Sequence, residues 1–261
     1  MAARPGAPTA VGVVARLRAA GCVFAEDEAR LLLAAAEDAG ALEALVARRV
    51  GGEPLERVLG WAEFCGLRIA VEPGVFVPRR RTELLVTEAR RGWHAGAVVV
   101  DLCCGSGAVG AALAAAVAPL ELHAVDVDPA AVRCARRNLA GRGHVYTGDL
   151  LAPLPERLRG RVDVVIANAP YVPTDALALL PPEARLYEPR AALDGGPDGL
   201  DVLRRVVTKA PRWLSPGGRV LVETSERQAP AVVAAMEAAH LRARVVRDED
   251  LGGLVVAGRG E

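Results

Sequence analysis

The sequence predicts an α/β protein in which a seven-stranded, mostly parallel sheet follows a small unit made only of helices. Two observations carry this prediction. Short apolar runs alternate with helical segments from residue 82 to the C-terminus, whereas residues 9–50 show helical spacing alone. Hydrophobic residues make up 52% of the 261 positions, which is enough for a sizeable core.

The N-terminal residues are predicted to form a bundle of short helices, and we expect this helical unit to span residues 1–60. Val11, Val14 and Leu17 recur at helical spacing after Thr9, a residue type that is favoured as an N-cap. Glycines divide the pattern into several helices, at Gly21, Gly40, Gly51 and Gly52.

Residues 61–80 are predicted to form a β-hairpin that links the helical unit to the sheet. The segment 64–71 is short and β-like, and Glu72-Pro73-Gly74 supplies turn residues. Residues 75–77 would then be the returning strand.

Seven strands and five helices are expected within residues 81–261. Helices between successive strands favour parallel pairing with right-handed crossovers. Only a short turn separates the last two strands, which favours an antiparallel hairpin at one edge of the sheet. The predicted strands are 97–100, 121–125, 144–147, 162–167, 219–223, 244–247 and 253–257, and the predicted helices are 82–91, 106–117, 129–139, 199–213 and 229–240.

The composition argues against several classes of function. Acidic and basic residues balance at 32 each, so the basic excess of a dedicated duplex-binding protein is missing. The 5 cysteines show no Cys-x-x-Cys spacing and the 4 histidines are scattered, so we expect no disulfide framework and no metal site. Residues 1–8 lack the apolar core of a signal peptide, and no apolar run reaches membrane-spanning length. We therefore expect a soluble, cytoplasmic protein.

A loop with two glycines follows the first predicted strand of the sheet. Asp101 ends that strand, and Gly105-Ser106-Gly107 leads into a helix, where unpaired N–H groups and close backbone approach favour ligand binding. Asp126 ends the next strand, where its carboxylate can accept both hydroxyls of a ribose. Read alone, this pattern fits a dinucleotide as well as it fits S-adenosylmethionine.

Two acids favour S-adenosylmethionine. Asp101 lies where a carboxylate can meet the amino group of a methionine moiety, and Asp149 ends the third strand, where it can accept a hydrogen bond from an adenine amino group. Asp126 and Asp149 are alternatively helix caps, because aspartate is favoured at that position. The residues that we predict to bind the cofactor are Asp101, Cys103, Gly105, Ser106, Gly107, Asp126, Val127, Asp149, Leu150 and Asn168.

The tetrapeptide Asn168-Ala169-Pro170-Tyr171 ends the strand 162–167, and ligands of such sheets bind outside the carboxyl ends of strands. An amide nitrogen is a poor nucleophile because its lone pair is delocalised into the carbonyl group. The Asn168 side-chain oxygen and the Ala169 carbonyl oxygen can accept its two N–H hydrogens and hold it in line with a methyl donor. Pro170 would restrict the turn, and Tyr171 would pack on a planar acceptor. We predict that these four residues are catalytic, although Asn and Pro also occur in ordinary turns.

Further motifs occur in an order that is typical of one family. They are the segments 54–60, 64–67 and 73–79, Thr82-Glu83, Asp101-x-x-x-Gly105-Ser106-Gly107, Glu188-Pro189, Gly195-Gly196-x-Asp198-Gly199 and Glu223. With these motifs the chain resembles the protein-(glutamine-N5) methyltransferases that modify peptide-chain release factors. The resemblance implies a Rossmann-like class I methyltransferase sheet with its last strand antiparallel, S-adenosylmethionine as cofactor, and the glutamine of a Gly-Gly-Gln loop as acceptor. It also implies that the helical unit recognises a protein substrate and that residues 81–261 form the methyltransferase domain of a monomer without a stable nucleic-acid partner.

Two positions depart from the family pattern. Asn-Pro-Pro-Tyr is usual in the family, and Ala169 replaces the first proline here, although the carbonyl group survives. An acidic residue that usually follows Pro78-Arg79 is replaced in the run Arg79-Arg80-Arg81, which is either a solvated helix start or a partner-facing patch. Three alternatives stay open: an N-methyltransferase of another protein or a small molecule, an adenine-N6 nucleic-acid methyltransferase, and a cofactor-binding module without catalysis.

Overall fold

The computed structural model describes residues 9–260, so the expectation about a signal peptide in residues 1–8 lies outside the described part. The chain begins with a helical unit of α1 (Ala10–Ala19), α2 (Ala25–Ala35), α3 (Ala39–Val50) and α4 (Leu55–Leu59). Thr9 caps α1 as predicted, because its Oγ1 accepts a hydrogen bond from the Gly12 amide at 3.2 Å. Buried side chains of these helices form a core of their own, which includes Val13, Leu17, Leu32, Leu42 and Val46.

The hairpin lies earlier than the sequence predicted. Strands β1 (Trp61–Phe64) and β2 (Leu67–Ala70) are antiparallel, and Cys65 and Gly66 form the turn with φ angles of 50° and 73°. Two successive residues with positive φ match the twist of hairpin strands, which explains why the chain reverses here. The prediction of a turn at residues 72–74 with a returning strand at 75–77 was wrong: Glu72 and Val75 close a separate turn, and residues 75–77 do not form a strand.

The sheet confirms the predicted α/β class. Its order is β5-β4-β3-β6-β7-β9-β8, and β9 alone runs in the direction opposite to the other six strands of this sheet. The strands β5 and β6 have the predicted bounds, whereas β7 begins five residues earlier than expected. The strands are β3 (Ala97–Leu102), β4 (Leu120–Asp126), β5 (His144–Thr147), β6 (Val162–Ala167), β7 (Leu214–Glu223), β8 (Arg242–Asp248) and β9 (Gly253–Arg259).

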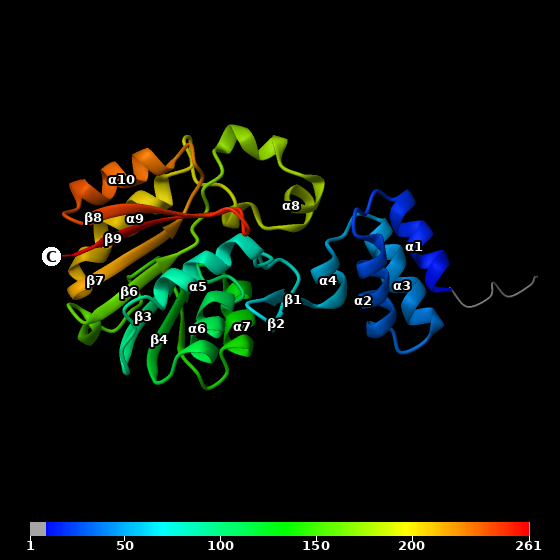
Figure 1. Cartoon of the computed structure of the whole chain (residues 1–261), viewed down its shortest axis with the longest axis horizontal. Helices are drawn as coiled ribbons and strands as arrows, with labels where there is room; N and C mark the ends of the chain where they lie inside the picture. Colours follow the sequence, from blue (N-terminus) through cyan, green and yellow to red (C-terminus); the bar gives the residue numbers. More distant parts are fainter. Residues whose placement is uncertain (1–8, 261) are drawn as a thin grey trace, which may run out of the picture.

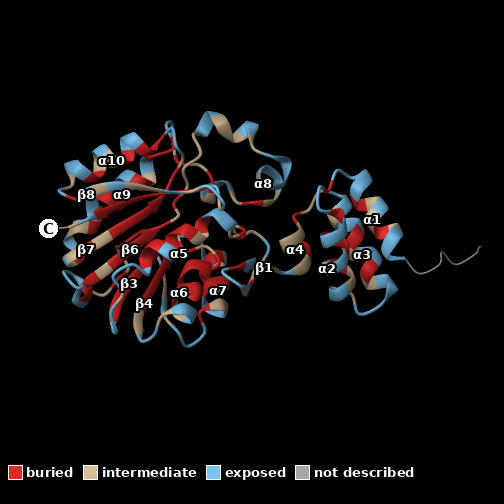
Figure 2. Ribbon diagram, in the orientation of Figure 1, coloured by how far each residue is buried: buried red, intermediate tan, exposed pale blue. Residues whose placement is uncertain are grey.

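Helices cover both faces of this sheet (Figure 1). On β3, Val98 and Val100 pack against α9 (Asp201–Lys209) and α10 (Ala229–Ala238), whereas Val99 packs against the opposite layer. That layer contains α5 (Glu83–Ala89), α6 (Ala108–Ala116) and α7 (Pro129–Asn138). Figure 2 shows the resulting buried sheet between the two layers. The remaining helical segments are α8 (Pro182–Tyr187) and the 3₁₀ helices Arg80–Thr82, Glu156–Leu158, Thr174–Leu179, Arg190–Ala192 and Ala210–Arg212.

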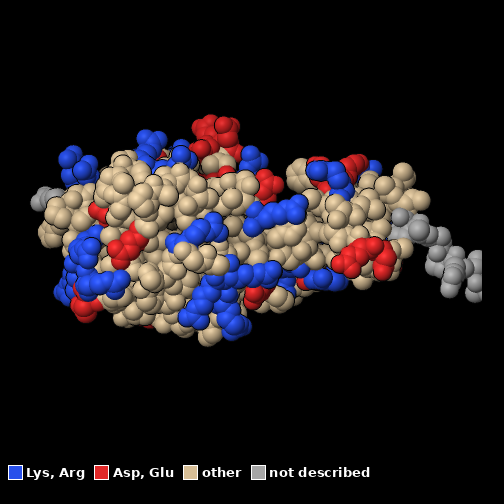
Figure 3. All heavy atoms as spheres, turned by 90° about the horizontal axis from the view of Figure 1, so that it is seen from below, with Lys and Arg blue, Asp and Glu red and all other residues tan. Residues whose placement is uncertain are grey.

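Charge is unevenly distributed, although the net charge is zero. Figure 3 shows basic side chains gathered on the lower face, beside the hairpin and α7. Exposed arginines on these elements are Arg68 on β2 and Arg133, Arg136 and Arg137 on α7. Across residues 9–260, no helix combines the length and the apolar character that a membrane crossing requires.

The separate core of the helical unit makes its stability testable. We expect Leu32→Ala to lower the free energy of unfolding of this unit by about 2–5 kcal/mol, because Leu32 is 0% exposed and its loss leaves a cavity. Val11→Ala is the control, since Val11 is 80% exposed and should change that free energy by less than about 0.5 kcal/mol. Denaturant titration followed by circular dichroism measures both values, and equal midpoints would refute the assignment of Leu32 to a core.

Candidate active site

A cavity of about 470 Å³ opens at the carboxyl ends of β3, β4, β5 and β6. This volume lies within the range of about 300–1,000 Å³ that is typical of small-molecule sites. The wall is completed by parts of the segments 74–82 and 180–193, the second of which contains α8 and the 3₁₀ helix after it. Of the predicted site residues, the cavity brings together Asp101, Cys103, Gly105, Ser106, Asp126, Val127, Asp149, Leu150, Asn168, Ala169, Pro170 and Tyr171.

Gly107 is the one predicted site residue that does not line the cavity. Both Gly105 and Gly107 have positive φ angles, 54° and 76°. A Cβ on Gly105 would point into open space, whereas a Cβ on Gly107 would lie 3.1 Å from the Cβ of Ala135 on α7. Gly105 therefore leaves the cavity wall open to a ligand, while Gly107 permits close packing of α6 on α7.

Asp126 has the geometry of a ribose-binding acid. One carboxylate oxygen accepts a hydrogen bond from the Gly105 amide at 2.8 Å, and the other accepts from the Asp128 amide at 2.9 Å. These bonds orient the carboxylate while each oxygen keeps further acceptor capacity. Burial raises the pKa of Asp126 above its ordinary value.

Asp101 is a carboxyl group that is buried almost completely, at 1% exposed. Its Oδ2 accepts a hydrogen bond from the Gly110 amide at 3.1 Å. Burial is the main reason that the pKa of Asp101 rises to about 7, and the nearby negative charge of Asp126 adds to the shift. A cation that enters the cavity would reverse this shift, since an opposite charge favours the ionised carboxylate.

The loop after β5 brings Asp149 and Leu150 to the cavity. Asp149 is half-exposed and ion-pairs with Arg205 of α9, which also lines the cavity and which the sequence analysis missed because 56 positions separate the two. Leu150 is buried with a φ angle of 51°, an uncommon conformation for a leucine. Val127 is 64% exposed and forms part of the cavity rim.

The cysteines of the loop are poor nucleophiles. Cys103 lines the cavity in a left-handed backbone conformation, with a φ angle of 53°. Burial and the neighbouring carboxylates raise the pKa of both Cys103 and Cys104, so their thiols stay protonated.

Asn168 lies where β6 ends, with its side chain oriented by Thr82. The Asn168 Nδ2 donates a hydrogen bond to the Thr82 Oγ1 at 3.3 Å, so this contact does not use the amide oxygen of Asn168, a residue that lines the cavity. Thr82 is buried, and the sequence analysis quoted it as part of a motif without assigning this role. Ala169 follows at 2% exposed, so the departure from proline occurs inside the wall of the cavity.

Tyr171 belongs to a polar cluster with the buried Glu223 and with Arg81. The tyrosine hydroxyl donates a hydrogen bond to the Glu223 Oε1 at 3.2 Å, and the Arg81 Nε donates to the same oxygen at 3.0 Å. Burial and the carboxylate raise the pKa of Tyr171 to about 12, so the phenol stays neutral.

Arg79 pairs with Glu188 in the same wall, so the run Arg79-Arg80-Arg81 is not simply a solvated helix start. Of these three arginines, only Arg80 lies outside the cavity.

Close backbone packing holds the tetrapeptide in place. A Cβ on Gly199 would lie 2.3 Å from the Tyr171 carbonyl oxygen, and a Cβ on Gly195 would lie 2.7 Å from the Pro170 carbonyl oxygen. The buried Gln228 donates to the Tyr171 carbonyl at 2.8 Å. These contacts explain the glycine motif at 195–199. The role of Gln228 could not be predicted from the sequence, because Gln228 lies 57 positions away from Tyr171.

The residues present fit S-adenosylmethionine. The open space at Gly105 admits a ligand close to the backbone, and Asp126 offers an oriented carboxylate for a ribose. The buried Asp101 lacks a cationic partner among residues 9–260. The ammonium group of S-adenosylmethionine would be such a partner.

The raised pKa of Asp101 makes the stability of the ligand-free protein depend on pH. Below the ordinary pKa of an aspartate both states are protonated, so the group has no effect, whereas above about pH 7 its ionised form is buried and destabilises the fold. We expect Asp101→Asn to raise the free energy of unfolding by more than about 1 kcal/mol at pH 8, and by much less at pH 4. Chemical denaturation at both pH values measures the difference. A gain that did not change with pH would show that the pKa of Asp101 is the same in the folded and the unfolded protein.

Comparison with known proteins identifies the family. The sequence model of a family described as "Methyltransferase small domain" matches residues 66–179. A release factor glutamine methyltransferase of Geobacter sulfurreducens is 45% identical over 201 residues, which are 76% of this chain and 69% of that protein. Its counterpart in Cereibacter sphaeroides is 37% identical over 263 residues and 92% of each chain.

A third relative is a 4-amino-L-phenylalanine/4-methylamino-L-phenylalanine methyltransferase of Streptomyces pristinaespiralis, which is 39% identical over 202 residues, 74% of this chain and 68% of that protein. These relatives are all methyltransferases, which agrees with the strand order of the sheet and with a cavity that fits S-adenosylmethionine. The chain belongs to the release factor glutamine methyltransferase family, whose members depend on S-adenosylmethionine.

Proposed function

We propose that this protein transfers a methyl group from S-adenosylmethionine to the side-chain amide nitrogen of a protein glutamine, the one in the Gly-Gly-Gln loop of a peptide-chain release factor. The observation that carries the proposal is the position of the oriented Asn168 amide in the same cavity as Asp101 and Asp126. The identity of the acceptor is inferred from the relatives, which are release factor glutamine methyltransferases.

The acceptor amide would be activated by hydrogen bonds rather than by a strong base. When bound, S-adenosylmethionine supplies a methyl group on a positively charged sulfur. The Asn168 side-chain oxygen and the Ala169 carbonyl accept the two N–H hydrogens of the glutamine, which draws electron density onto nitrogen and aims its lone pair at the methyl group. The N–C bond would form as the S–C bond breaks, and one amide proton would leave to solvent.

Tyr171 and Pro170 would shape the acceptor side. The neutral Tyr171 ring packs on the planar amide, and its hydroxyl is held by Glu223, which prevents the ring from turning away. Pro170 restricts the backbone of Ala169 to an extended conformation, which keeps the carbonyl directed at the acceptor.

The cofactor would lie along the loops after β3, β4 and β5. Asp101 meets the ammonium group, Asp126 holds the ribose, and Asp149 accepts from the adenine amino group, with Cys103, Gly105, Ser106, Val127 and Leu150 as the surrounding wall. In this assignment residues 1–60 recognise the substrate, 61–80 link the two parts, and 81–261 carry the reaction.

A monomer that acts on release factors in the cytoplasm fits this proposal, with no stable nucleic-acid partner. The arginines Arg68, Arg133, Arg136 and Arg137 do not line the cavity, so they do not form the basic cleft that a base-flipping enzyme needs.

Asn168→Ala tests the catalytic assignment. We expect it to reduce kcat by at least about 100-fold, the scale of losing one oriented hydrogen-bond partner of the transition state, while the Kd for S-adenosylmethionine changes little. Single-turnover methylation and calorimetry measure the two quantities. Retention of near-normal turnover would refute hydrogen-bond activation by Asn168.

The acceptor is tested with an intact release factor and mass spectrometry. The glutamine of its Gly-Gly-Gln loop should gain one methyl group, and Gln→Ala in that loop should abolish labelling. Ala169→Pro should keep the activity, because position 169 precedes Pro170 and contributes only its carbonyl.

If neither the wild-type enzyme nor Ala169→Pro methylates the release factor, 4-amino-L-phenylalanine is the next acceptor to test, because a relative acts on it. Turnover of that amine alone would replace the glutamine proposal with a small-molecule acceptor.

A further inference from the structure

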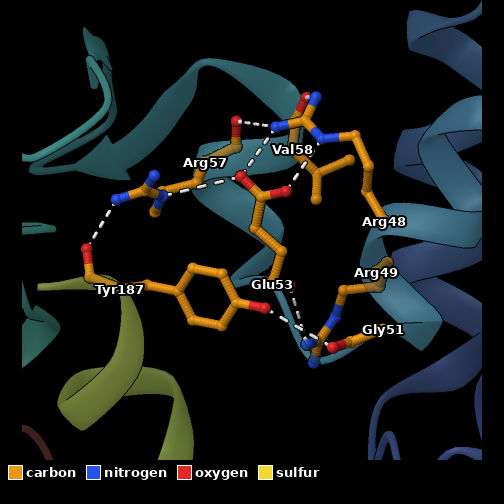
Figure 4. A network of polar contacts seen from close by, with 7 residues as sticks. All are labelled: Arg48, Arg49, Gly51, Glu53, Arg57, Val58 and Tyr187. Atoms are coloured by element: carbon orange, nitrogen blue, oxygen red, sulfur yellow. Dashed lines mark hydrogen bonds and ion pairs between the residues drawn. The ribbon is translucent and has the colours of Figure 1, made fainter.

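We propose that Arg57, in the helical unit, is a positioning residue for the acceptor side of the cavity and acts through Tyr187 and Glu188. The kinetic effects expected of the variants rest on the proposed function, because they are measured with the release factor as acceptor. Its structural basis is a polar network that joins α3 and α4 to α8, which Figure 4 shows from close by.

Arg57 contacts Tyr187 in two ways. Its NH1 donates a hydrogen bond to the Tyr187 carbonyl oxygen at 2.5 Å, and its guanidinium lies 5.5 Å from the centre of the Tyr187 ring. The Arg57 side chain is only 14% exposed and also pairs with Glu53 at 3.6 Å. The tyrosine hydroxyl in turn reaches back to the Gly51 carbonyl oxygen at 3.4 Å. The last residue of α8 is thus held by the helical unit through both its backbone and its side chain (Figure 4).

Arg49 makes a second connection, at the start of α8. Its guanidinium is 10% exposed and donates to Glu28 of α2 and to Glu183 of α8, each at 2.6 Å. It also donates to the Glu53 carbonyl oxygen at 3.1 Å. The short helix α8 is therefore fastened to the helical unit near both of its ends.

Glu188, the next residue after Tyr187, links this network to the cavity. Its side chain is 1% exposed, and its Oε1 accepts from the Val77 amide at 3.2 Å and from Arg79 at 2.6 Å. Its Oε2 is buried without a hydrogen-bond partner in the described part of the chain. Glu188 itself is one of the cavity-lining residues, so the residue that follows Tyr187 belongs to the cavity wall.

A shift of the Tyr187 backbone must therefore move Glu188, Arg79 and the acceptor wall together. The two cores do not depend on Arg57, since the buried apolar side chains of the helical unit and of the sheet form separate clusters. Loss of Arg57 should consequently alter the acceptor side without unfolding either part and without disturbing Asp101 or Asp126.

Four variants test the inference: Arg57→Ala, Arg57→Lys, Glu188→Gln and the double variant Arg57→Ala/Glu188→Gln. Arg16→Ala is the matched control, because Arg16 makes a two-pronged pair with Glu43 inside the helical unit, at 2.6 and 2.8 Å, and does not touch α8. We expect Arg57→Ala to raise the KM for the release factor by about tenfold and to leave the Kd for S-adenosylmethionine unchanged. Arg57→Lys should show a smaller rise in KM, and Arg16→Ala should have the KM of the wild type. In the Glu188→Gln background, Arg57→Ala should add little, because both act on one contact.

A second readout needs no acceptor. The Val77 amide is bonded to Glu188, so its hydrogen exchange should accelerate in Arg57→Ala but not in Arg16→Ala. Unchanged exchange of the Val77 amide in Arg57→Ala would overturn the inference. A double variant whose KM rises by the product of the two single effects would also overturn it. Absence of release-factor methylation by the wild type, with accelerated exchange in Arg57→Ala, would instead overturn the proposed acceptor and leave the positioning role supported.

Discussion

The reversal of strand order between β3 and β6 determines where the cavity of this molecule opens. The chain leaves β3 for β4 and β5 on one side and returns to β6 on the other, so the loops after β3 and β6 diverge. Crevices of this kind are where open α/β sheets bind ligands. Here the crevice places the loop of Gly105 opposite the tetrapeptide that begins at Asn168, so one cavity serves both a methyl donor and its acceptor.

Buried acids surround this crevice, and they destabilise the ligand-free protein. Asp101, Glu188 and Glu223 are each less than 9% exposed, and burial raises the pKa of Asp101 and Glu188. One oxygen each of Glu188 and Glu223 has no hydrogen-bond partner among the described residues. Apolar residues would stabilise such positions better, so we interpret Asp101 and Glu188, which line the cavity, as groups whose missing partners arrive with ligands.

Features that depend on short-range patterns could be predicted from the sequence. The strands β5 and β6 have the predicted bounds because each is a brief run between clear breakers, and the cap at Thr9 follows from residue type alone. The hairpin turn was misplaced because Glu72-Pro73-Gly74 is the stronger composition signal, although Cys65-Gly66 adopts the conformation that hairpins need.

Features that depend on distant contacts could not be predicted. Arg205 meets Asp149, and Gln228 meets Tyr171, only after the sheet has formed. Gly107 is a related case, because its role is decided by Ala135 on another helix rather than by the glycine pattern around it. Twelve of the predicted site residues still line the cavity, since strand ends converge once the α/β order is known.

The joint between the helical unit and α8 has a consequence for how this architecture diversifies. Its contacts include guanidinium groups, a carboxylate, backbone carbonyls and the ring of Tyr187. A polar joint of a few directional contacts constrains only the residues that make them. The rest of the helical surface is therefore free to change under selection for new partners, while the catalytic chemistry of the sheet is inherited intact.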